Sequence, residues 1–445
     1  MSEKSYDSGV SIKPADVHKV LGKYMLVDGY PIVLDLEKSK GSWVYDSISG
    51  KKYLDFFTFF ASNPIGHNHP GLLEKDYYDR LAEVAVNKPS NSDLYTTEMA
   101  EFVETFHRVA VPEGFNNLFF VSGGALAVEN ALKAAFDWKV RKNMKKGIEG
   151  EKGQKVIHFR EAFHGRTGYT MSLTNTDPTK IKHFPKFDWP RIENPKVTFP
   201  IEDNLADIEA AEKRAVESIE KVIAEDGDDI AAIIIEPIQG EGGDNHFRGE
   251  FLRELRRIAD DNEVILIYDE VQTGVGITGK MWAWQNYGVA PDILAFGKKT
   301  QVCGIMSTDR INEVDSVFKV SGRINSTWGG NLLDMYRAKR IFEIIERDNL
   351  VQNAVERGQQ LQKGLRKIQS EHSDIISNAR GLGMFCAFDL KDDKTRDELV
   401  EKLFENGLFI LKCGCSTIRF RPPLNVSAEE IEEGIRVISD TLNQM

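Results

Sequence analysis

The chain has few cysteines, no long apolar run and no apolar leader. Only four of its 445 residues are cysteine, at positions 303, 386, 413 and 415, and their spacing matches no disulfide framework, zinc site or CxxC redox motif. We therefore expect four reduced thiols, a cytoplasmic location and no metal. The first residues lack the apolar core of a secretory signal, and no run reaches the roughly 18 apolar residues of a membrane span, so we expect no membrane partner.

Positive charge is also in deficit. The chain has 57 lysine and arginine residues against 69 aspartate and glutamate residues, which gives a formal net charge of −12. Such a balance repels nucleic acid, and we expect none as a partner. With 41% hydrophobic and 28% charged residues, the composition is that of a globular chain. At this length the chain can bury a core without disulfides or metals.

The middle of the chain, residues 71–330, alternates helical and strand-like patterns. We expect apolar strands at residues 118–121, 155–159, 230–235 and 264–268, and helices at residues 126–146, 205–224 and 250–260. Strands that are apolar throughout and alternate with helices are typical of a parallel sheet buried on both faces. We therefore predict an α/β fold in which residues 71–330 form a large domain around a mostly parallel sheet.

The two ends of the chain predict a smaller domain. Residues 331–445 have the pattern of helices at 332–346, 351–370 and 429–443 and of strands at 384–388, 408–411 and 417–420, which is an α+β arrangement. The N-terminal segment, residues 1–70, has the pattern of short strands at 32–36, 42–45 and 52–55. We expect this segment to pack with the C-terminal domain, so that the small domain is discontinuous.

Two strand-like runs end in charged residues of opposite sign. The run 265–268 ends at Asp269, and the run 291–297 ends at Lys298 and Lys299. Neighbouring strands of one parallel sheet would bring Asp269 and a lysine into the same crevice. Pyridoxal phosphate requires such a pair, because a lysine amine forms its Schiff base and a carboxylate keeps its pyridine nitrogen protonated. Taken alone, the same residues are equally typical of a helix cap and a solvated strand end.

Three further loops follow predicted strands and could line that crevice. The Gly-Gly-Ala segment 123–125 joins a strand to a helix, and the exposed N–H groups of such a turn can bind phosphate. Phe163 could stack on a flat ring, and Arg166 could bind a carboxylate in bidentate geometry. Glu241 lies in a glycine-rich loop at the carboxyl edge of the predicted sheet. Each segment alone is as typical of an ordinary turn or surface loop.

Seven short motifs occur along the chain in a characteristic order. They are Gly-Gly-Ala at 123–125, Phe-His-Gly-Arg at 163–166, Glu-Pro-Ile-Gln-Gly-Glu at 236–241, Asp-Glu-Val-Gln-Thr-Gly at 269–274, Phe-Gly-Lys-Lys at 296–299, Thr-Trp-Gly-Gly-Asn at 327–331 and Arg-Phe-Arg-Pro-Pro-Leu at 419–424. This order resembles the class III, or omega, aminotransferases, which are pyridoxal phosphate enzymes of fold type I. Within that class the chain is most similar to the L-lysine 6-aminotransferases, in the stretches 87–93, 184–192, 297–304 and 325–331.

The resemblance implies a role around the cofactor for several motif residues. Lys298 would form the Schiff base and move protons, and only one lysine of the pair can serve if both lie on a strand, where adjacent side chains face opposite ways. Asp269 would pair with the pyridinium nitrogen. The remaining contacts would come from Val271 behind the ring, Phe163 on its other face, Gln272 at the phenolic oxygen, Gly124 and Ala125 at the phosphate, and Thr327 from the second subunit of a homodimer.

The resemblance also implies how substrates bind. Arg166 would bind the distal carboxylate of the substrate, with Asn325 nearby. Arg419 would bind the α-carboxylate of 2-oxoglutarate or L-glutamate, and Glu241 would pair with Arg419 while lysine occupies the site. One departure concerns the phosphate turn, where Gly123 replaces the serine of many relatives, so that a hydroxyl contact is lost while the backbone donors remain.

The implied activity is transfer of the ε-amino group of L-lysine to 2-oxoglutarate, giving 2-aminoadipate 6-semialdehyde and L-glutamate. Glutamate reacts at its α-amine and lysine at its ε-amine, and two arginines at different distances would separate the two cases. Three alternatives stay open: an ornithine or 4-aminobutyrate aminotransferase, a pyridoxal phosphate aminomutase or racemase, and a non-catalytic binding protein. A substrate panel tests the first, the need for a 2-oxoacid acceptor tests the second, and a spectral change on adding L-lysine tests the third.

Overall fold

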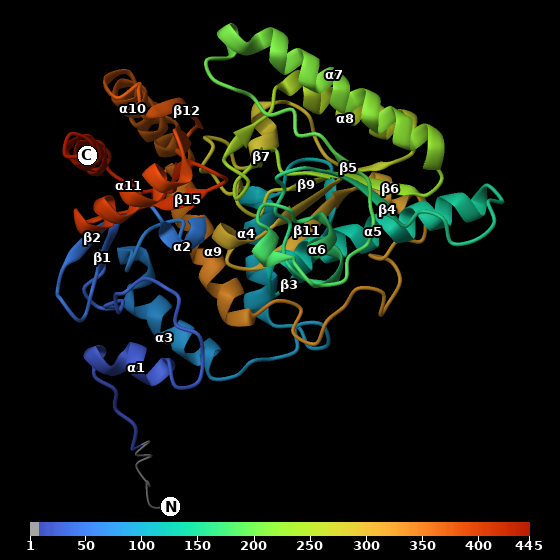
Figure 1. Ribbon diagram of the computed structural model, residues 1–445. Coiled ribbons are helices and arrows are strands. Elements are labelled where there is room, and N and C mark those ends of the chain that lie inside the picture. Colours follow the sequence, from blue (N-terminus) through green and yellow to red (C-terminus); the bar gives the residue numbers. More distant parts are fainter. Residues whose placement is uncertain (1–8) are drawn as a thin grey trace, which may run out of the picture.

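The computed structural model describes residues 9–445 and is organised around one large sheet (Figure 1). The sheet has seven strands in the order β3-β11-β10-β9-β6-β4-β5. All neighbours pair in parallel except β11, which runs antiparallel to β10 and β3. The strand bounds are β3 (Phe115–Val121), β4 (Lys155–Phe159), β5 (Arg191–Ile192), β6 (Ile230–Ile235), β9 (Ile265–Asp269), β10 (Ile293–Phe296) and β11 (Cys303–Thr308). The predicted α/β fold with a mostly parallel sheet is confirmed.

Helices cover both faces of this sheet. The helices α5 and α6 lie on one face, and α7 and α8 lie on the other, where they run together along the top of the view in Figure 1. A sheet covered in this way is buried on both faces, which explains why its strands are apolar throughout. The helix bounds are α3 (Lys75–Ala85), α4 (Thr97–Ala110), α5 (Gly124–Lys145), α6 (Gly168–Leu173), α7 (Ile201–Asp226) and α8 (Gly249–Asp261).

The side chains of each central strand alternate between the two faces. In β9, Ile265 and Ile267 belong to the apolar cluster on the α5 side, whereas Leu266 and Tyr268 belong to the cluster on the α8 side. This is the two-residue period of an extended strand. By the same period Asp269, the last residue of β9, lies on the α5 side at the carboxyl edge of the sheet.

A smaller lobe contains a second sheet, with four antiparallel strands in the order β12-β13-β16-β15. Three helices accompany this sheet: α10, α11 and α12. The bounds are α10 (Leu350–Glu371), β12 (Ile376–Leu382), β13 (Phe385–Leu390), α11 (Asp393–Glu405), β15 (Leu411–Cys413), β16 (Thr417–Phe420) and α12 (Ala428–Leu442). These elements form the α+β arrangement that the sequence predicts for the C-terminal part of the chain.

The N-terminal strands pair with this C-terminal part. The strand β2 (Lys52–Asp55) runs antiparallel to β1 (Trp43–Tyr45) and parallel to β14 (Leu408–Phe409). In Figure 1 the blue β1 and β2 lie beside the red C-terminal elements. The small lobe is therefore built from both ends of the chain. The remaining short elements are α1 (Val17–Leu21), α2 (Thr58–Ala61), β7 (Ile238–Gln239) and β8 (Asn245–His246).

The domain boundaries at residues 70 and 330 stay predictions. One apolar cluster crosses the second boundary, because α9 (Leu332–Arg347) packs on α4. Within that contact the rings of Phe106 and Phe342 lie edge to face with their centres 5.3 Å apart. Residues 1–8, which include the start of the predicted N-terminal segment and bear on the expected absence of a secretory signal, lie outside the described residues. In the described part, no helix has both the length and the apolar character needed to cross a membrane.

Two predicted strands differ from the structure. Residues 32–36 contain only a single bridge, between Leu34 and Asp46, because side chains take the place of a ladder: the Val33 N–H donates to Oδ1 of Asp46 at 2.9 Å. Residues 408–411 split into β14 and β15. Phe409 pairs with β2 while Leu411 pairs with β16, so the chain passes from one sheet to the other at Ile410.

Candidate active site

A cavity of about 450 Å³ lies at the carboxyl edge of the large sheet. The turns that follow β4, β6, β9 and β10 form its walls together with the first turn of α5. Strand ends of a parallel sheet converge at this edge, which is where ligands bind in such folds. Nine of the twelve predicted site residues line the cavity: Gly124, Ala125, Phe163, Arg166, Glu241, Asp269, Val271, Gln272 and Lys298.

Asp269 is buried in the wall of the cavity and has two fixed partners. Its Oδ2 lies 2.8 Å from Nδ1 of His164, and its Oδ1 accepts a hydrogen bond from the Val271 N–H at 3.0 Å. His164 is also buried, and among the described residues its Nε2 has no hydrogen-bond partner. A carboxylate held in this way is preorganised to stabilise a positive charge inside the cavity.

Lys298 follows β10 and begins a short 3-10 turn, Lys298–Thr300. Its backbone φ is +53°, in the left-handed region that a lysine rarely adopts. Such a conformation is typical of residues whose position serves a site. Burial, reinforced by the Arg419 charge, lowers the pKa of the Lys298 amine to about 8. The amine is therefore far more available as a nucleophile near neutral pH than that of an ordinary lysine.

The neighbouring Lys299 does not line the cavity. It is buried, and its Nζ donates to the backbone carbonyl oxygens of Gln272 and Gly274, both at 2.8 Å. Only one lysine of the pair faces the cavity, as predicted, but the reason given from the sequence is wrong. The pair lies in a 3-10 turn and not on a strand. Lys299 ties this turn to the turn that follows β9.

The predicted phosphate turn is the N-terminus of α5. Gly123 has φ +122°, a conformation that glycine adopts without strain. The N–H of Ala127 bonds back to the Gly123 carbonyl at 3.0 Å, which leaves the N–H groups of Gly124 and Ala125 without a partner in the helix. A Cβ added to Gly165 would lie 2.5 Å from Cβ of Ala125, so a second turn packs directly against this one. Unpaired N–H groups at the start of a 22-residue helix are suited to an anion.

Phe163 and Val271 form apolar walls of the cavity. The Phe163 N–H donates to Oε1 of Glu236 at 3.0 Å, and the Gly240 N–H donates to Oε2 of the same residue at 3.0 Å. Burial raises the pKa of Glu236 to about 7. Val271 packs on the phosphate turn, since a Cβ on Gly124 would lie 2.9 Å from Cγ1 of Val271. The backbone of Phe163 and the side chain of Val271 are thus held by contacts within the cavity wall.

Two arginines set the orientation of Gln272. Its Oε1 accepts hydrogen bonds from Nη1 of Arg419 at 3.2 Å and from Nη2 of Arg421 at 3.1 Å. An amide oxygen is an acceptor and its nitrogen a donor. Because the oxygen faces the two cations, the NH₂ group is the part of Gln272 left to donate into the cavity.

Glu241 bridges two cations. Nη2 of Arg419 donates to its Oε2 at 2.6 Å, and Nζ of Lys180 donates to its Oε1 at 2.5 Å. Arg419 is fully buried and does not line the cavity, whereas Glu241 does. Burial opposes ionisation of Glu241, but the charges of Arg419 and Lys180 together hold its pKa below the usual value. The implied Glu241–Arg419 pair is present in the structure.

Arginines of the small lobe hold the loop that carries Glu241. Arg380, on β12, donates from Nε to the Asp244 carbonyl at 2.9 Å and from Nη2 to the Gly243 carbonyl at 2.5 Å. Arg421, which follows β16, pairs with the Asp244 carboxylate at 2.5 Å, and both side chains are buried. The loop between β7 and β8 is therefore fixed to the small lobe at several points besides Glu241.

Three predicted residues do not line the cavity of a single chain: Arg419, Asn325 and Thr327. Arg419 is buried and paired with Glu241, while Asn325 and Thr327 are exposed on the surface. The Thr327 carbonyl accepts a hydrogen bond from Oγ of Ser90 at 2.6 Å. Arg166 is at the exposed rim and, within residues 9–445, has no hydrogen bond or ion pair. The binding roles of Asn325, Thr327 and Arg166 stay predictions.

Sequence reasoning missed His164, Glu236, Cys303 and Lys180. The first two adjoin predicted residues in the motifs, and a buried histidine beside an aspartate could have been sought there. Cys303 lines the cavity three residues after the end of the turn Lys298–Thr300. Lys180 has no such signal, because it lies in a polar loop 61 residues before Glu241.

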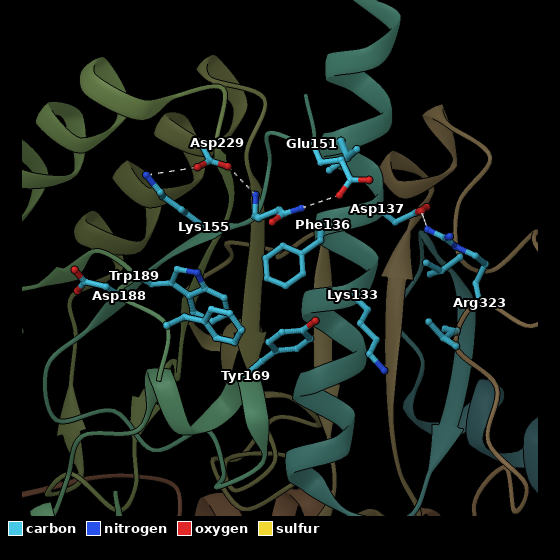
Figure 2. A pocket seen from close by; sticks show the side chains of 15 residues that line it. Lys133, Phe136, Asp137, Glu151, Lys155, Tyr169, Asp188, Trp189, Asp229 and Arg323 are labelled. Atoms are coloured by element: carbon cyan, nitrogen blue, oxygen red, sulfur yellow. Dashed lines mark hydrogen bonds and ion pairs between the residues drawn. The ribbon is translucent and has the colours of Figure 1, made fainter. Parts of the chain in front are cut away.

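A larger cavity, of about 610 Å³, lies along the middle of α5 (Figure 2). Its aromatic wall contains Phe136, whose ring centre lies 5.6 Å from that of Tyr169 and 5.7 Å from that of Trp189. Several charged groups at the rim are paired with one another, and Figure 2 shows the ion pairs of Arg323 with Asp137 and of Lys155 with Asp229. The chemistry is therefore assigned to the smaller cavity, which combines a buried amine with a buried carboxylate.

The chain belongs to the class-III aminotransferases. The family model described as aminotransferase class-III matches residues 24–442, nearly the whole chain. The cofactor of this family is pyridoxal 5′-phosphate, and its fold is fold type I. Both agree with the large α/β domain and with the residues that converge on the smaller cavity.

Among the relatives of this chain, lysine aminotransferases have a higher sequence identity than a 4-aminobutyrate aminotransferase. A solved lysine aminotransferase from Mycobacterium tuberculosis superposes with a TM-score of 0.96 and is 50% identical, covering 97% of this chain and 100% of that one. An L-lysine-epsilon aminotransferase from Streptomyces clavuligerus is 48% identical over 96% of this chain and 94% of its own length. The human mitochondrial 4-aminobutyrate aminotransferase is 31% identical over 91% of this chain and 84% of its own length.

Proposed function

We propose that this chain transfers the ε-amino group of L-lysine to 2-oxoglutarate, producing 2-aminoadipate 6-semialdehyde and L-glutamate. The observation that carries the proposal is the position of Glu241, which lines the cavity and pairs with the buried Arg419. L-lysine presents no carboxylate beside its reacting carbon, whereas 2-oxoglutarate does. A site that must accept both needs an arginine that pairs with an internal carboxylate in one case and with the substrate carboxylate in the other. The similarity to lysine aminotransferases supports the same donor.

The residues of the smaller cavity fit pyridoxal phosphate. The unpaired N–H groups of Gly124 and Ala125 would hold the phosphate, and the Gln272 NH₂ group would donate to the phenolic oxygen. Phe163 and Val271 would cover the two faces of the ring. When bound, the cofactor supplies a ring that stabilises negative charge on the carbon attached to the transferred amine.

Two buried groups of the chain would serve this chemistry directly. Asp269, fixed by His164 and the Val271 N–H, would hold a proton on the ring nitrogen by its negative charge. The Lys298 amine, with its pKa lowered to about 8, would take a proton from the substrate carbon and return one to a neighbouring atom. His164 is a positioning residue, since it acts on the cavity through Asp269.

Substrate choice is assigned to the charged groups at the other end of the cavity. Arg166, exposed at the rim and without an ion pair in the described part of the chain, would bind the carboxylate far from the reacting carbon, with Asn325 nearby. Arg419 would bind the carboxylate beside the reacting carbon once Glu241 moves aside. A bidentate arginine–carboxylate contact is short and directional, so two such sites at different depths distinguish an α-amine from an ε-amine.

The nearest alternative is an ornithine or 4-aminobutyrate aminotransferase. These donors also present a terminal amine without a neighbouring carboxylate, so the Glu241–Arg419 pair suits them equally. The lower identity of the human 4-aminobutyrate enzyme, 31% against 48% for the S. clavuligerus lysine enzyme, favours lysine.

An aminomutase or racemase on the same scaffold is less well supported. Neither reaction uses a 2-oxoacid acceptor, so neither requires an arginine that alternates between an internal carboxylate and a substrate. The Glu241–Arg419 contact at 2.6 Å favours amino transfer.

A homodimer is part of the proposal. Thr327 is exposed and does not line the cavity of its own chain. In the proposed dimer it would reach the phosphate bound by the partner chain. A cytoplasmic location also stays a prediction, supported by the free state of the four cysteines.

Single-turnover absorbance of the cofactor tests the proposed function. The holoenzyme is mixed separately with L-lysine, L-ornithine, 4-aminobutyrate and L-glutamate, and the rate of the spectral change is measured for each. We expect L-lysine and L-glutamate to react fastest and the product from lysine to carry an aldehyde at C6. A faster reaction with ornithine or 4-aminobutyrate would identify that compound as the donor in place of lysine. If 2-oxoglutarate does not accept the amine from the loaded enzyme, amino transfer is excluded.

A further inference from the structure

The contact between Lys180 and Glu241 has no role in amino transfer as described above. We propose that Lys180 is a positioning residue for the acceptor half-reaction: it retains the Glu241 carboxylate when Glu241 releases Arg419 to the α-carboxylate of glutamate or 2-oxoglutarate. The inference deepens the proposed function, because it rests on an exchange of partners by Arg419.

The two oxygens of Glu241 are divided between two cations. Oε2 accepts from Arg419 at 2.6 Å and Oε1 accepts from Lys180 at 2.5 Å. The side chain of Arg419 is fully buried, whereas those of Glu241 and Lys180 are each 24% exposed. The Lys180 contact is therefore on the outer side of the carboxylate. Glu241 can leave Arg419 and still keep one charged partner.

The surroundings of Lys180 hold it in place. It ends a 3-10 turn, Pro178–Lys180, which Asp177 caps by accepting a hydrogen bond from the Thr179 N–H at 2.8 Å. Its Nζ lies 5.3 Å from the centre of the Phe163 ring, within the range of a cation–π contact. The amine is thus fixed by the loop, by an aromatic face and by Glu241.

Neighbouring hydrogen bonds anchor the same loop to the cavity wall. Asn175 receives the Glu161 N–H at 2.6 Å and donates to the Phe159 carbonyl at 3.0 Å. Glu161 and Phe159 belong to the strand end and turn that lead to Phe163. Lys180 therefore keeps its position relative to the cavity when Glu241 moves.

The expected consequence concerns the balance between two arrangements. With lysine as substrate, Glu241 contacts both cations. With glutamate, Arg419 contacts the substrate and Glu241 contacts Lys180 alone, so no charge is left buried without a partner. Removing the Lys180 amine weakens both arrangements, but it removes the only partner of Glu241 in the second. The variant should therefore hold Glu241 on Arg419 and oppose glutamate binding.

Direct contact of Lys180 with substrate is the competing reading. Lys180 does not line the cavity, whereas Glu241 does. Its Nζ already donates a hydrogen bond to Oε1 of Glu241 at 2.5 Å. Both observations favour action through Glu241.

Three single variants test the inference in the holoenzyme. Lys180→Met removes the amine but keeps most of the aliphatic length, and Lys180→Arg restores a cation. Lys182→Met is the matched control, because Lys182 is an exposed lysine of the same loop with no ion pair among residues 9–445. We expect Lys180→Met to raise the half-saturating glutamate concentration about tenfold, which corresponds to about 1.4 kcal/mol. The limiting rate with glutamate and both constants with L-lysine should change less than threefold.

The Arg variant should recover most of the glutamate affinity, and the Lys182 variant should match the wild type. Equal loss with both donors in Lys180→Met, or loss of the limiting rate alone, overturns the inference. A double variant, Lys180→Met with Glu241→Gln, then identifies the route of the effect. If Lys180 acts through Glu241, its substitution has no further effect on glutamate affinity in the Gln background. A persisting tenfold effect shows direct contact with substrate and overturns the inference.

Failure of the proposed function would be distinguishable from failure of this inference. If the wild type prefers another terminal amine to L-lysine, the donor is wrong, but the selective loss of glutamate affinity in Lys180→Met is still expected. If L-lysine is the donor and that selective loss is absent, the proposed function stands and Lys180 has no positioning role.

Discussion

The two ends of the active-site cavity are built in different ways. At the inner end, formed by Lys298, Asp269 and the first turn of α5, each group comes from the edge of the large sheet, and Asp269 is held by two partners of its own. At the outer end, Arg419 comes from the small lobe and Lys180 from a loop, and both share the single carboxylate of Glu241. The inner end suits steps that both half-reactions have in common. The shared carboxylate suits a choice between substrates.

The largest expected effect is at the inner end, in Lys298→Ala. Among the described residues Lys298 supplies the only amine that lines the cavity, so its loss should abolish covalent attachment of the cofactor and amino transfer from both L-lysine and L-glutamate. Single-turnover absorbance measures the rates, and borohydride reduction followed by peptide mapping locates the attached lysine. A label on Lys299 would contradict the assignment.

Lys299→Met serves as the comparison variant. It should keep the label on Lys298 but lower the free energy of unfolding by about 1–3 kcal/mol, because two buried carbonyl oxygens lose their donor. The sequence alone predicts no cost at this position.

Asp269→Asn should slow both half-reactions by about a thousandfold while the cofactor stays bound through its phosphate. A neutral amide cannot hold the proton on the ring nitrogen, and this need is the same for either donor. The two single-turnover rates and the cofactor content of the purified variant are the measurements. A large loss with one donor only would break the proposed division between the inner and outer ends.

Arg419→Ala should act selectively. We expect the transition-state stabilisation measured by kcat/KM for L-glutamate to fall by about 3 kcal/mol, the scale for removing one partner of a buried charged pair. The same quantity for L-lysine should fall much less. Half-reaction kinetics with the two donors provide the test. Equal losses would mean that Arg419 does not distinguish the substrates. The proposed exchange of Arg419 between Glu241 and the substrate carboxylate would then be wrong.

Glu241→Gln should have a smaller effect of the opposite kind. Reactivity with L-glutamate is retained, while the advantage of L-lysine over L-glutamate as donor should fall about tenfold, because an amide pairs weakly with Arg419. Competition between the two donors for the holoenzyme measures this ratio. An unchanged ratio would remove Glu241 from substrate choice.

The smallest expected effect concerns the pH at which the apoprotein captures pyridoxal phosphate. Burial and the Arg419 charge disfavour the ammonium form of Lys298, so its proton leaves at lower pH than in an ordinary lysine. The rate at which apoprotein captures added pyridoxal phosphate should rise with pH through a midpoint near 8. Arg419→Ala should move this midpoint upward. A wild-type midpoint above pH 10, near the usual lysine value of about 10.4, would contradict the lowered pKa.

Local pattern was sufficient for most of the fold. The strands β4 and β6 begin and end at the predicted residues, because a continuous apolar run buried on both faces has few other interpretations. Residues 32–36 show where pattern fails. Their alternation suits a strand, but Asp46 takes up the Val33 N–H with its side chain, and nothing in the segment itself reveals that partner.

The active site divides in the same way. Motif order was sufficient to bring Asp269, Lys298 and Glu241 to one cavity: Asp269 ends β9, Lys298 follows β10 and Glu241 lies in the loop after β7. The turn at Lys298 was predicted as a strand, because its left-handed backbone is imposed by packing that the sequence does not reveal. Lys180 could not be predicted, since its role depends on a three-dimensional contact across 61 residues of chain.

The arginines of the small lobe that hold the Glu241 loop have a consequence for speed. When Glu241 leaves Arg419, the contacts of Arg380 and Arg421 with Gly243 and Asp244 stay in place. The lobes can therefore remain docked while a single side chain turns. Rotamer changes of exposed side chains take picoseconds to nanoseconds, whereas hinge motions of domains take microseconds to milliseconds. The change from donor to acceptor would then require no hinge motion, and the enzyme could alternate between two unlike substrates without opening.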